Sequence, residues 1–200
     1  MNAQTPSGEH ATETSVYRAA LRRERLAARL AIEPAALAAA SASIEGHLAA
    51  LLGPLPRGVL GFCAPVRNEF DARPLAGRLL DAGWTAAMPV VVAEASPMRF
   101  RTWTPSTAMG ADRYGMPIPL NTGDAVPTVI LLPLVGFDAQ GFRLGYGGGY
   151  FDRTLASLSP RPLAVGVGFE VARCDDVRPQ DHDVRLDATV TEAGVVHHST

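Results

Sequence analysis

The chain has 200 residues, of which 47% are hydrophobic and 19% charged, and its formal net charge is −2. This predicts a folded protein that needs neither disulfides nor a structural metal, and it argues against a dedicated nucleic-acid binder. All 18 Lys+Arg positions are Arg, which excludes lysine-dependent Walker A, protein kinase and pyridoxal sites. Cys63 and Cys174 form no CxxC pair, which excludes a zinc knuckle.

The N-terminal part combines a polar tail with two helical segments. Residues 1–14 lack the basic and apolar regions of a signal peptide, and we expect a disordered tail ahead of a single domain at 15–200. Apolar spacing predicts a helix over 15–32, and Pro34 begins a second, Ala-rich helix that ends before Gly53. We find no apolar run near the roughly 18 residues of a membrane span, and we expect a cytoplasmic protein without membrane contact.

Four arginines lie at helical spacing along the first predicted helix. Arg18, Arg22, Arg25 and Arg29 fall on one face of that helix. Two interpretations are open from the pattern alone: a solvated polar face, or a stripe that faces a bound anion.

The remaining segments alternate between apolar strands and helices. Short apolar runs bounded by Gly and Pro are typical of buried strands. Residues 105–127 are rich in Gly, Pro, Asn and Asp, and they predict a long irregular connection of the kind that is usually functional. The predicted strands are 58–64, 85–92, 98–104, 128–135, 163–169, 187–191 and 194–198, and the predicted helices are 71–82 and 150–158.

This alternation predicts an α/β fold with a mostly parallel sheet covered by helices on both faces. Ligands of such sheets bind at the carboxyl ends of the strands. The loops at 64–70, 136–150 and 170–183 leave the predicted strands at those ends. We therefore expect the functional site among these three loops.

A glycine-rich loop at 145–149 precedes the predicted helix at 150–158. Successive glycines can direct their N–H groups toward one anion, and the N-terminus of a helix adds positive potential. Arg143 and Arg153 flank the loop. A phosphate cradle and a flexible structural turn are both compatible with this pattern.

Three acidic residues are candidates for chemistry. Asp152 is either a partner of the helix dipole or, beside phosphates, a ligand of Mg²⁺. Glu69 either caps the following helix, in competition with Asp71, or binds the N–H groups of a heterocycle. Asp183 belongs to an Asp-His-Asp cluster at 181–183 whose simplest interpretation is a solvated loop.

The segment from Gly136 to Arg153 (GFDAQGFRLGYGGGYFDR) resembles the signature of the 5-formyltetrahydrofolate cyclo-ligase (5,10-methenyltetrahydrofolate synthetase) family. Three positions depart from the family pattern: Phe151 replaces Tyr, Arg18 replaces Lys, and Ile118 stands where an acid is common. Weaker matches within 15–195 are Arg18-x-x-Leu21-Arg22, Glu69-x-Asp71, Gly115-Met116-Pro117-x-Pro119, His182-Asp183-x-x-Leu186-Asp187 and Val190-Thr191-Glu192.

The resemblance implies a Rossmann-like three-layer α/β sandwich and an ATP-dependent ring closure. MgATP would phosphorylate the formyl oxygen of 5-formyltetrahydrofolate, and the N10 amine would then displace phosphate to give 5,10-methenyltetrahydrofolate and ADP. The implied cofactor is Mg²⁺, the co-substrate is ATP, and the partner is a small-molecule folate. We expect a monomer that binds neither nucleic acid nor membrane. Arg and Mg²⁺ can neutralise phosphoryl charge without Lys.

The resemblance also assigns the site residues. Arg143 and Tyr150 are expected to be catalytic, and Asp152 and Asp183 to hold Mg²⁺. The residues expected to contact ATP are Arg18, Ala19, Ala20, Leu21, Arg22, Arg143, Leu144, Gly145, Tyr146, Gly147, Gly148, Gly149, Tyr150 and Phe151. Those expected to contact the folate are Arg22, Ala64, Glu69, Tyr146, Gly147, Gly148, Gly149 and Tyr150, with Tyr114 as a candidate for stacking.

Three other functions are open. An isomerase or acyl-transfer enzyme would need a base such as Glu69 or Asp138, and nothing in the sequence pairs with either. A non-catalytic folate- or nucleotide-binding paralogue is the main alternative, although the intact acids at 152 and 183 argue against it. An interaction module built on the arginine stripe would bind anionic surfaces, which the net charge of −2 disfavours.

Overall fold

The structure is a computed structural model that describes residues 7–198, with side chains from residue 12 onward. The helices are α1 (Ser7–Leu30), α2 (Pro34–Leu52), α3 (Arg73–Asp81) and α4 (Tyr150–Ser157), with a 3-10 turn η1 (Glu170–Ala172). The strands are β1 (Val59–Gly61), β2 (Thr85–Val90), β3 (Arg99–Trp103), β4 (Met109–Ala111), β5 (Pro117–Pro119), β6 (Asp124–Ala125), β7 (Val129–Pro133), β8 (Gly136–Phe137), β9 (Arg143–Leu144), β10 (Leu163–Val167), β11 (Ala188–Thr191) and β12 (Gly194–His197).

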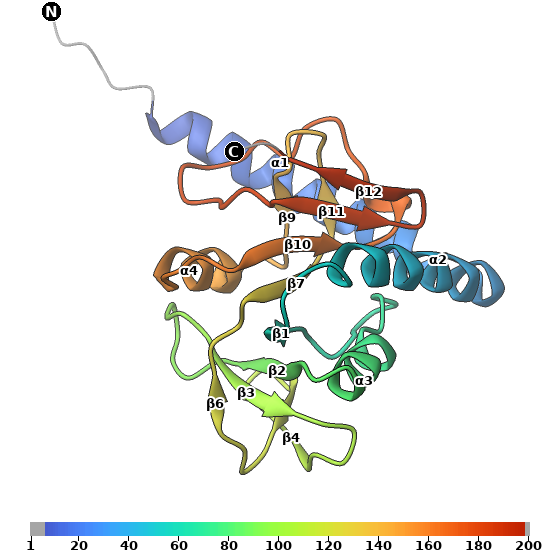
Figure 1. Cartoon of the computed structure of the whole chain (residues 1–200). Coiled ribbons are helices and arrows are strands. Elements are labelled where there is room, and N and C mark those ends of the chain that lie inside the picture. Colours follow the sequence, from blue (N-terminus) through green and yellow to red (C-terminus); the bar gives the residue numbers. More distant parts are fainter. Residues whose placement is uncertain (1–6, 199–200) are drawn as a thin grey trace, which may run out of the picture.

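The main sheet of the described chain has eight strands in the order β12-β11-β10-β7-β1-β2-β3-β6 (Figure 1). Strands β11, β10, β7, β1 and β2 run parallel, while β12 and β3 pair antiparallel with β11 and β2. The predicted mostly parallel sheet is confirmed. From β1 the chain continues to β2 on one side, and from β7 it continues to β10 on the other. The loops after β1 and β7 therefore leave the sheet in opposite directions, which makes this position a topological switch point, where ligands of open sheets bind.

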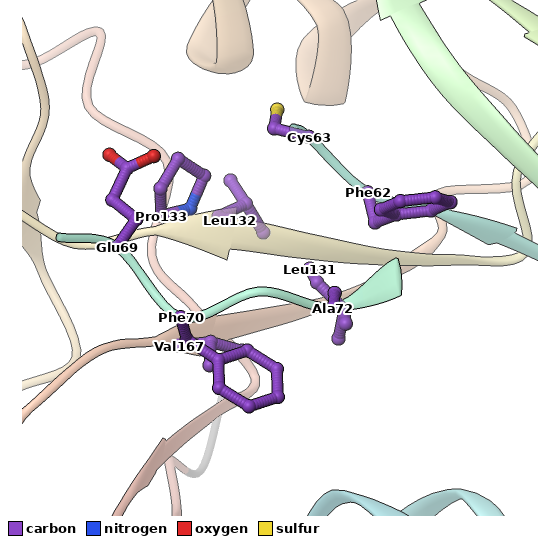
Figure 2. Close-up of a pocket in the computed structure, with 9 residues that line it drawn as sticks. All are labelled: Phe62, Cys63, Glu69, Phe70, Ala72, Leu131, Leu132, Pro133 and Val167. Carbon is purple, nitrogen blue, oxygen red and sulfur yellow. The ribbon is translucent and has the colours of Figure 1, made fainter. Parts of the chain in front are cut away.

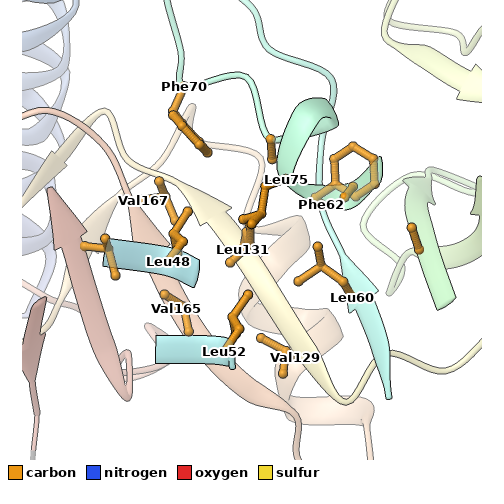
Figure 3. Packing of buried hydrophobic residues seen from close by; sticks show 14 of the residues in the cluster. Leu48, Leu52, Leu60, Phe62, Phe70, Leu75, Val129, Leu131, Val165 and Val167 are labelled. Atoms are coloured by element: carbon orange, nitrogen blue, oxygen red, sulfur yellow. The ribbon is translucent and has the colours of Figure 1, made fainter. Parts of the chain in front are cut away.

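Both faces of the sheet are covered, so the predicted three-layer arrangement is also confirmed. Along β7, Val129 and Leu131 pack in one core with α2 and α3, while Ile130 and Leu132 pack in a second core with Leu155 of α4. This alternation is the ordinary consequence of a strand buried on both faces. Figure 3 shows the first core, with Leu48, Leu52, Leu60, Phe62, Phe70, Leu75, Val165 and Val167 around Val129 and Leu131.

Helix α1 begins at Ser7, well before the predicted start at 15. The disordered tail predicted for 1–14 is therefore helical over 7–14, and residues 1–6 lie outside the described residues. No proline follows Pro6 within this stretch, so nothing in the backbone prevents the helix from extending. The helix packs against the loops at the carboxyl ends of the strands, with Leu21 in a small core beside Leu144 and Val177.

Helix α2 corrects the prediction that no apolar run approaches the length of a membrane span. Its 19 residues reach a mean hydropathy of 1.4, which is enough by length and composition alone. Repeated alanine raises the average without adding large side chains. Ile44, Leu48 and Leu52 form its buried face, and the helix contacts β11 and β12.

The segment 105–127 is more ordered than the prediction of an irregular connection. It contains the hairpin β4–β5 and the short edge strand β6. The hairpin turn is fixed by Asp112, whose Oδ1 accepts hydrogen bonds from the N–H groups of Tyr114 and Met116. Gly115 occupies the left-handed region at φ 76°, which glycine adopts without strain.

Replacing Gly46 with Ala is expected to raise the free energy of unfolding by about 0.5–1 kcal/mol. Gly46 lies inside α2, and a Cβ there meets nothing within 4 Å. The urea midpoint measures the effect. Gly149→Ala is the matched control and should destabilise, because Gly149 has φ 62° and a Cβ would lie 2.9 Å from the Arg153 guanidinium. A lower midpoint for Gly46→Ala would contradict the prediction.

Candidate active site

A cleft of about 1030 Å³ opens at the carboxyl ends of β1, β2 and β7. The three predicted loops, 64–70, 136–150 and 170–183, all contribute to its wall, and α1 contributes a further side. The three loops therefore meet at one cleft, as the strand order predicts. The cleft is large enough for two ligands of ordinary size to lie side by side.

The glycine-rich loop forms one wall of the cleft. Gly147 and Gly149 lie in the left-handed region at φ 99° and 62°, and Gly149 immediately precedes α4. Arg22 donates from Nε to the Gly145 carbonyl at 2.6 Å, and Arg153 donates to the Gly148 carbonyl. Guanidinium groups thus hold the loop on both sides, which favours a preformed anion cradle over a flexible turn.

The arginine stripe of α1 faces the protein and not the solvent. Arg18 donates two hydrogen bonds to Asp183, at 2.5 and 3.3 Å, and Arg25 donates to the Val171 carbonyl. Burial, and then the charge of Arg18, lower the pKa of Arg22. Two guanidinium groups close together at a cleft wall favour a bound anion, because an anion relieves their repulsion. Because these contacts are internal, the interaction-module alternative loses its basis.

Arg143 and Asp152 form an ion pair at the base of the glycine-rich loop. Arg143 is 6% exposed and donates to Asp152 Oδ1 at 2.9 Å and to the Val184 carbonyl at 3.0 Å. The hairpin β8–β9 positions Arg143, and the first turn of α4 positions Asp152. The Val184 N–H also donates to Asp152 Oδ1, at 3.0 Å. Both side chains are therefore fixed before any ligand binds.

The carboxylates of Asp152 and Asp183 suit a metal ion that arrives with phosphate. Both line the cleft, and each is paired with an arginine. Among the described side chains, residues 12–198, no three His, Cys, Asp or Glu residues are grouped as a metal centre. Mg²⁺ binds through one or two carboxylates together with substrate phosphates and waters. The residues present fit Mg²⁺ carried by a nucleotide and do not form a protein-only metal cage.

Glu69 is a buried carboxylate that lines the cleft and contacts the glycine-rich loop. Its Oε1 accepts a hydrogen bond from the Tyr146 hydroxyl at 2.5 Å, and its Oε2 accepts one from the Val66 N–H at 3.0 Å. Burial raises the pKa of Glu69, while these hydrogen bonds and the nearby arginines oppose that rise. Asp71 accepts the Arg73 N–H at the start of α3, so the capping role falls to Asp71 and Glu69 faces the cleft.

Tyr146 links the glycine-rich loop to this carboxylate. Burial and the neighbouring Glu69 raise the pKa of Tyr146 to about 12. The hydroxyl therefore stays protonated at neutral pH and is available to donate its hydrogen bond.

Two tyrosines close one side of the cleft. The hydroxyls of Tyr114 and Tyr150 lie 2.7 Å apart, which joins the β4–β5 hairpin to the start of α4. This hydrogen bond raises the pKa of Tyr150. Arg153 lies over the Tyr150 ring at 5.0 Å, and Arg113 lies over the Tyr114 ring at 5.4 Å. Tyr114 is 52% exposed, so its ring is available for stacking.

A second cavity of about 20 Å³ lies beside Glu69, which is enough for one water molecule. Figure 2 shows Glu69 and Cys63 on either side of Pro133 and Leu132 at the carboxyl end of β7. Burial raises the pKa of the Cys63 thiol, which stays protonated at neutral pH. Cys63 is half-buried and lines both this cavity and the cleft.

Some predicted nucleotide contacts are not part of the cleft wall. Leu21 and Leu144 are buried together in a small core, and Ala20 is exposed outside the wall. Asp138, an alternative base, is 1% exposed and accepts backbone N–H groups of Gln140 and Phe142, which is a structural role. The other predicted contacts, Arg18, Ala19, Arg22, Ala64, Glu69, Arg143, Gly145, Tyr146, Gly147, Gly148, Gly149, Tyr150 and Phe151, line the cleft together with Asp152 and Asp183.

The sequence reasoning missed the apolar part of the cleft wall. Its residues are Met88, Pro89, Val91, Met98, Met116 and Pro117. The sequence feature that could have indicated this wall is the carboxyl end of the strand predicted at 85–92. A parallel sheet places that end beside the carboxyl ends of the strands predicted at 58–64 and 128–135. Ile118, one of the departures from the family pattern, lies outside the wall.

The chain is similar to proteins of one known family. The model of the 5-formyltetrahydrofolate cyclo-ligase family matches residues 14–192. The 5-formyltetrahydrofolate cyclo-ligase of Escherichia coli K12 is 31% identical over 135 residues, which cover 64% of this chain and 74% of that protein. The enzyme of the same name from Mycolicibacterium smegmatis is 28% identical over 142 residues, covering 66% of this chain and 73% of that protein.

Solved structures show the same fold. The 5,10-methenyltetrahydrofolate synthetase of Mycoplasma pneumoniae has a TM-score of 0.72 and 25% identity, and the match covers 88% of this chain and 98% of that chain. The synthetase of Aquifex aeolicus has a TM-score of 0.75 and 25% identity, with 92% and 93% covered. The family match spans all the loops that build the cleft. The chain belongs to the 5-formyltetrahydrofolate cyclo-ligase family.

Proposed function

We propose that this chain converts 5-formyltetrahydrofolate and ATP into 5,10-methenyltetrahydrofolate, ADP and phosphate, with Mg²⁺ bound to the nucleotide. One observation carries the proposal. The wall of a single cleft of about 1030 Å³ contains an arginine-held glycine loop in one part, and a buried carboxylate with apolar side chains in another. The two parts suit a polyphosphate and a flat heterocycle, and their proximity suits transfer between them.

The folate ring occupies the side of the cleft near Glu69. The carboxylate accepts N–H groups of the pterin, and Tyr146 and Val66 fix its two oxygens. Met88 and Met116 line the same cleft and cover the ring with adaptable apolar side chains. A buried acceptor paired with N–H donors discriminates strongly against rings that lack them.

The nucleotide phosphates occupy the glycine-rich loop. Backbone N–H groups at the start of α4 and the guanidinium groups of Arg18 and Arg22 face the transferred phosphoryl group and its neighbours. Arg143 lies at the base of the loop and neutralises charge on the transferring group. Tyr150 orients the reacting oxygen from the other end of the loop.

Mg²⁺, when bound with the nucleotide, supplies charge neutralisation between the phosphates, and Asp152 and Asp183 are the residues that would hold it. Both carboxylates are positioned by arginines, which limits their movement. The protein contributes position and electrostatics, and no side chain forms a covalent bond with the substrate.

The ring closure then proceeds in two steps. The formyl oxygen attacks the γ-phosphorus of ATP, the P–O bond to ADP breaks, and the formyl group becomes an O-phosphorylated iminium with a double bond between N5 and the formyl carbon. The N10 amine attacks the activated formyl carbon, loses its proton, and expels inorganic phosphate as the C–O bond breaks. The wall residues exclude water, which would otherwise hydrolyse the activated formyl group.

We further propose that the chain acts as a cytoplasmic monomer. Cys63 and Cys174 form no disulfide, which suits a reducing compartment.

Replacing Asp152 with Asn is expected to weaken ATP binding in Mg²⁺ by about tenfold or more, because one carboxylate ligand is lost. Calorimetry measures ATP binding with Mg²⁺ and with a chelator, and the difference between wild type and variant should disappear in the chelator. Folate affinity should stay within about twofold. Asp181→Asn is the matched control, since Asp181 lies outside the cleft wall. An Asp152→Asn protein with unchanged Mg²⁺ dependence would contradict the metal assignment.

A further inference from the structure

Arg29 is buried behind the cleft wall, and each of its three guanidinium nitrogens donates a hydrogen bond. It is 2% exposed. Nε donates to the Arg67 carbonyl at 2.9 Å, and one terminal nitrogen donates to the Leu134 carbonyl at 2.9 Å. The other terminal nitrogen donates to the Tyr146 hydroxyl at 2.7 Å and lies 3.6 Å from Glu69 Oε1.

These contacts join three separate segments at the switch point. Arg67 and Glu69 belong to the loop after β1, Leu134 follows β7, and Tyr146 belongs to the glycine-rich loop. A single planar guanidinium therefore fixes the spacing between the two parts of the cleft wall. A lysine cannot do this, because its ammonium is a compact point charge without the fork geometry of Arg.

The loop after β1 needs such a restraint. Arg67 and Asn68 have φ values of 51° and 59°, and two successive non-glycine residues in the left-handed region are uncommon. The carbonyl of Arg67 is the group that Arg29 Nε holds. The position of Glu69 directly after these residues depends on the conformation of this turn.

Arg29 also sets the charge around Glu69. The polar and titratable groups that face this carboxylate are the Arg29 and Arg67 guanidiniums, the Tyr146 hydroxyl, the Val66 N–H and the Cys63 thiol. The side chains of Arg29 and Glu69 are only 3% and 5% exposed, so solvent screens their attraction weakly. Without Arg29, burial would favour the protonated carboxyl group at higher pH.

We propose that Arg29 is a positioning residue for the folate ring: it holds the Glu69 carboxylate and the Tyr146 hydroxyl in place although it does not line the cleft itself. The inference rests on the proposed role of Glu69 in folate binding. On this proposal the last arginine of the stripe neither faces solvent nor contacts a bound anion, but acts on the folate site through Glu69 and Tyr146.

The test compares Arg29→Gln and Arg29→Lys with Arg25→Gln. Arg25 is the matched control because it belongs to the same stripe and donates to the Val171 carbonyl, away from Glu69. The measurements are the dissociation constants of 5-formyltetrahydrofolate and of ATP by calorimetry, and the KM for folate as a function of pH. Arg29→Lys keeps the charge and guards against failure of the Gln variant to fold.

Arg29→Gln is expected to weaken folate binding by roughly tenfold or more, because hydrogen bonds from a charged group are lost. ATP binding should stay within about twofold of wild type. The acid limb of the pH profile should move to higher pH, because Glu69 loses a cation that favours its ionised form. Arg29→Lys should restore the pH profile but only part of the affinity. In a Glu69→Gln background the effect of Arg29→Gln should shrink, since the two residues act together.

Three results would overturn the inference. The first is a folded Arg29→Gln or Arg29→Lys protein that binds folate as tightly as wild type. The second is an equal loss of affinity for folate and for ATP. The third is full additivity of the effects of Arg29→Gln and Glu69→Gln on folate binding. Failure of the proposed function is distinguishable from these results, because direct binding of folate is measured without turnover. If the wild-type protein binds folate without cyclising it, the folate dissociation constants of the Arg29 variants can still be compared with that of wild type.

Discussion

Replacing Arg143 with Gln is expected to lower kcat by about a thousandfold or more, while the KM for folate changes little. The side chain is 6% exposed and fixed by Asp152 and the Val184 carbonyl, so its charge is weakly screened and pre-oriented. Charge on a transferring phosphoryl group is greatest in the transition state. Loss of a preorganised cation therefore appears in kcat and not in substrate binding.

The Arg143 variant needs controls, because its removal leaves the Asp152 carboxylate without its cation. The double variant Arg143→Gln/Asp152→Asn keeps the local charge neutral and shows whether the fold tolerates the loss. Arg143→Lys keeps one charge without the two-pronged hydrogen bonding, and an intermediate kcat is expected. A folded Arg143→Gln protein with kcat within about tenfold of wild type would contradict the catalytic assignment.

Replacing Phe62 with Ala is expected to lower the free energy of unfolding by about 3–5 kcal/mol. Phe62 is fully buried directly after β1, and its ring packs edge-to-face on Trp103 with 5.1 Å between centroids. Removing it opens a void beside the small cavity near Glu69, where the strand cannot collapse because β2 and β7 hold β1 on both sides.

Urea denaturation measures this loss as a lower midpoint at unchanged slope. Phe62→Leu is the control and should cost less than about 1.5 kcal/mol, because most of the volume stays filled. A loss below about 1 kcal/mol for Phe62→Ala would show that the surrounding residues repack freely. The core beneath the cleft would then be less rigid than the packing of Phe62 indicates.

The fold could be predicted from the sequence where one local pattern dominates. The apolar run that forms β7 is buried on both faces, and Pro34 and Gly53 punctuate α2 as expected. The start of α1 was wrong because the tail has no helix-breaking residue after Pro6, and a polar composition does not by itself prevent a helix. The β4–β5 hairpin was missed because its turn depends on the side chain of Asp112.

The site could be predicted only where residues are close in sequence or follow strands. The glycine-rich loop and Glu69 were found in this way. Arg29 was named only as part of the arginine stripe, because its contacts involve carbonyls of Arg67 and Leu134 that are distant in the chain. Leu21 and Leu144 show the opposite error, since they lie inside matched motifs yet pack against each other in a small core.

The most direct test of the proposed function is the near-ultraviolet absorbance of purified protein mixed with 5-formyltetrahydrofolate, Mg²⁺ and ATP. The product 5,10-methenyltetrahydrofolate contains a conjugated amidinium with its own absorbance band, so its formation is visible directly. An absorbance rise that requires both ATP and Mg²⁺, with one phosphate released per product, is the expected result. The absence of a rise from protein that still binds the folate would contradict the proposed reaction and support a non-catalytic binding protein.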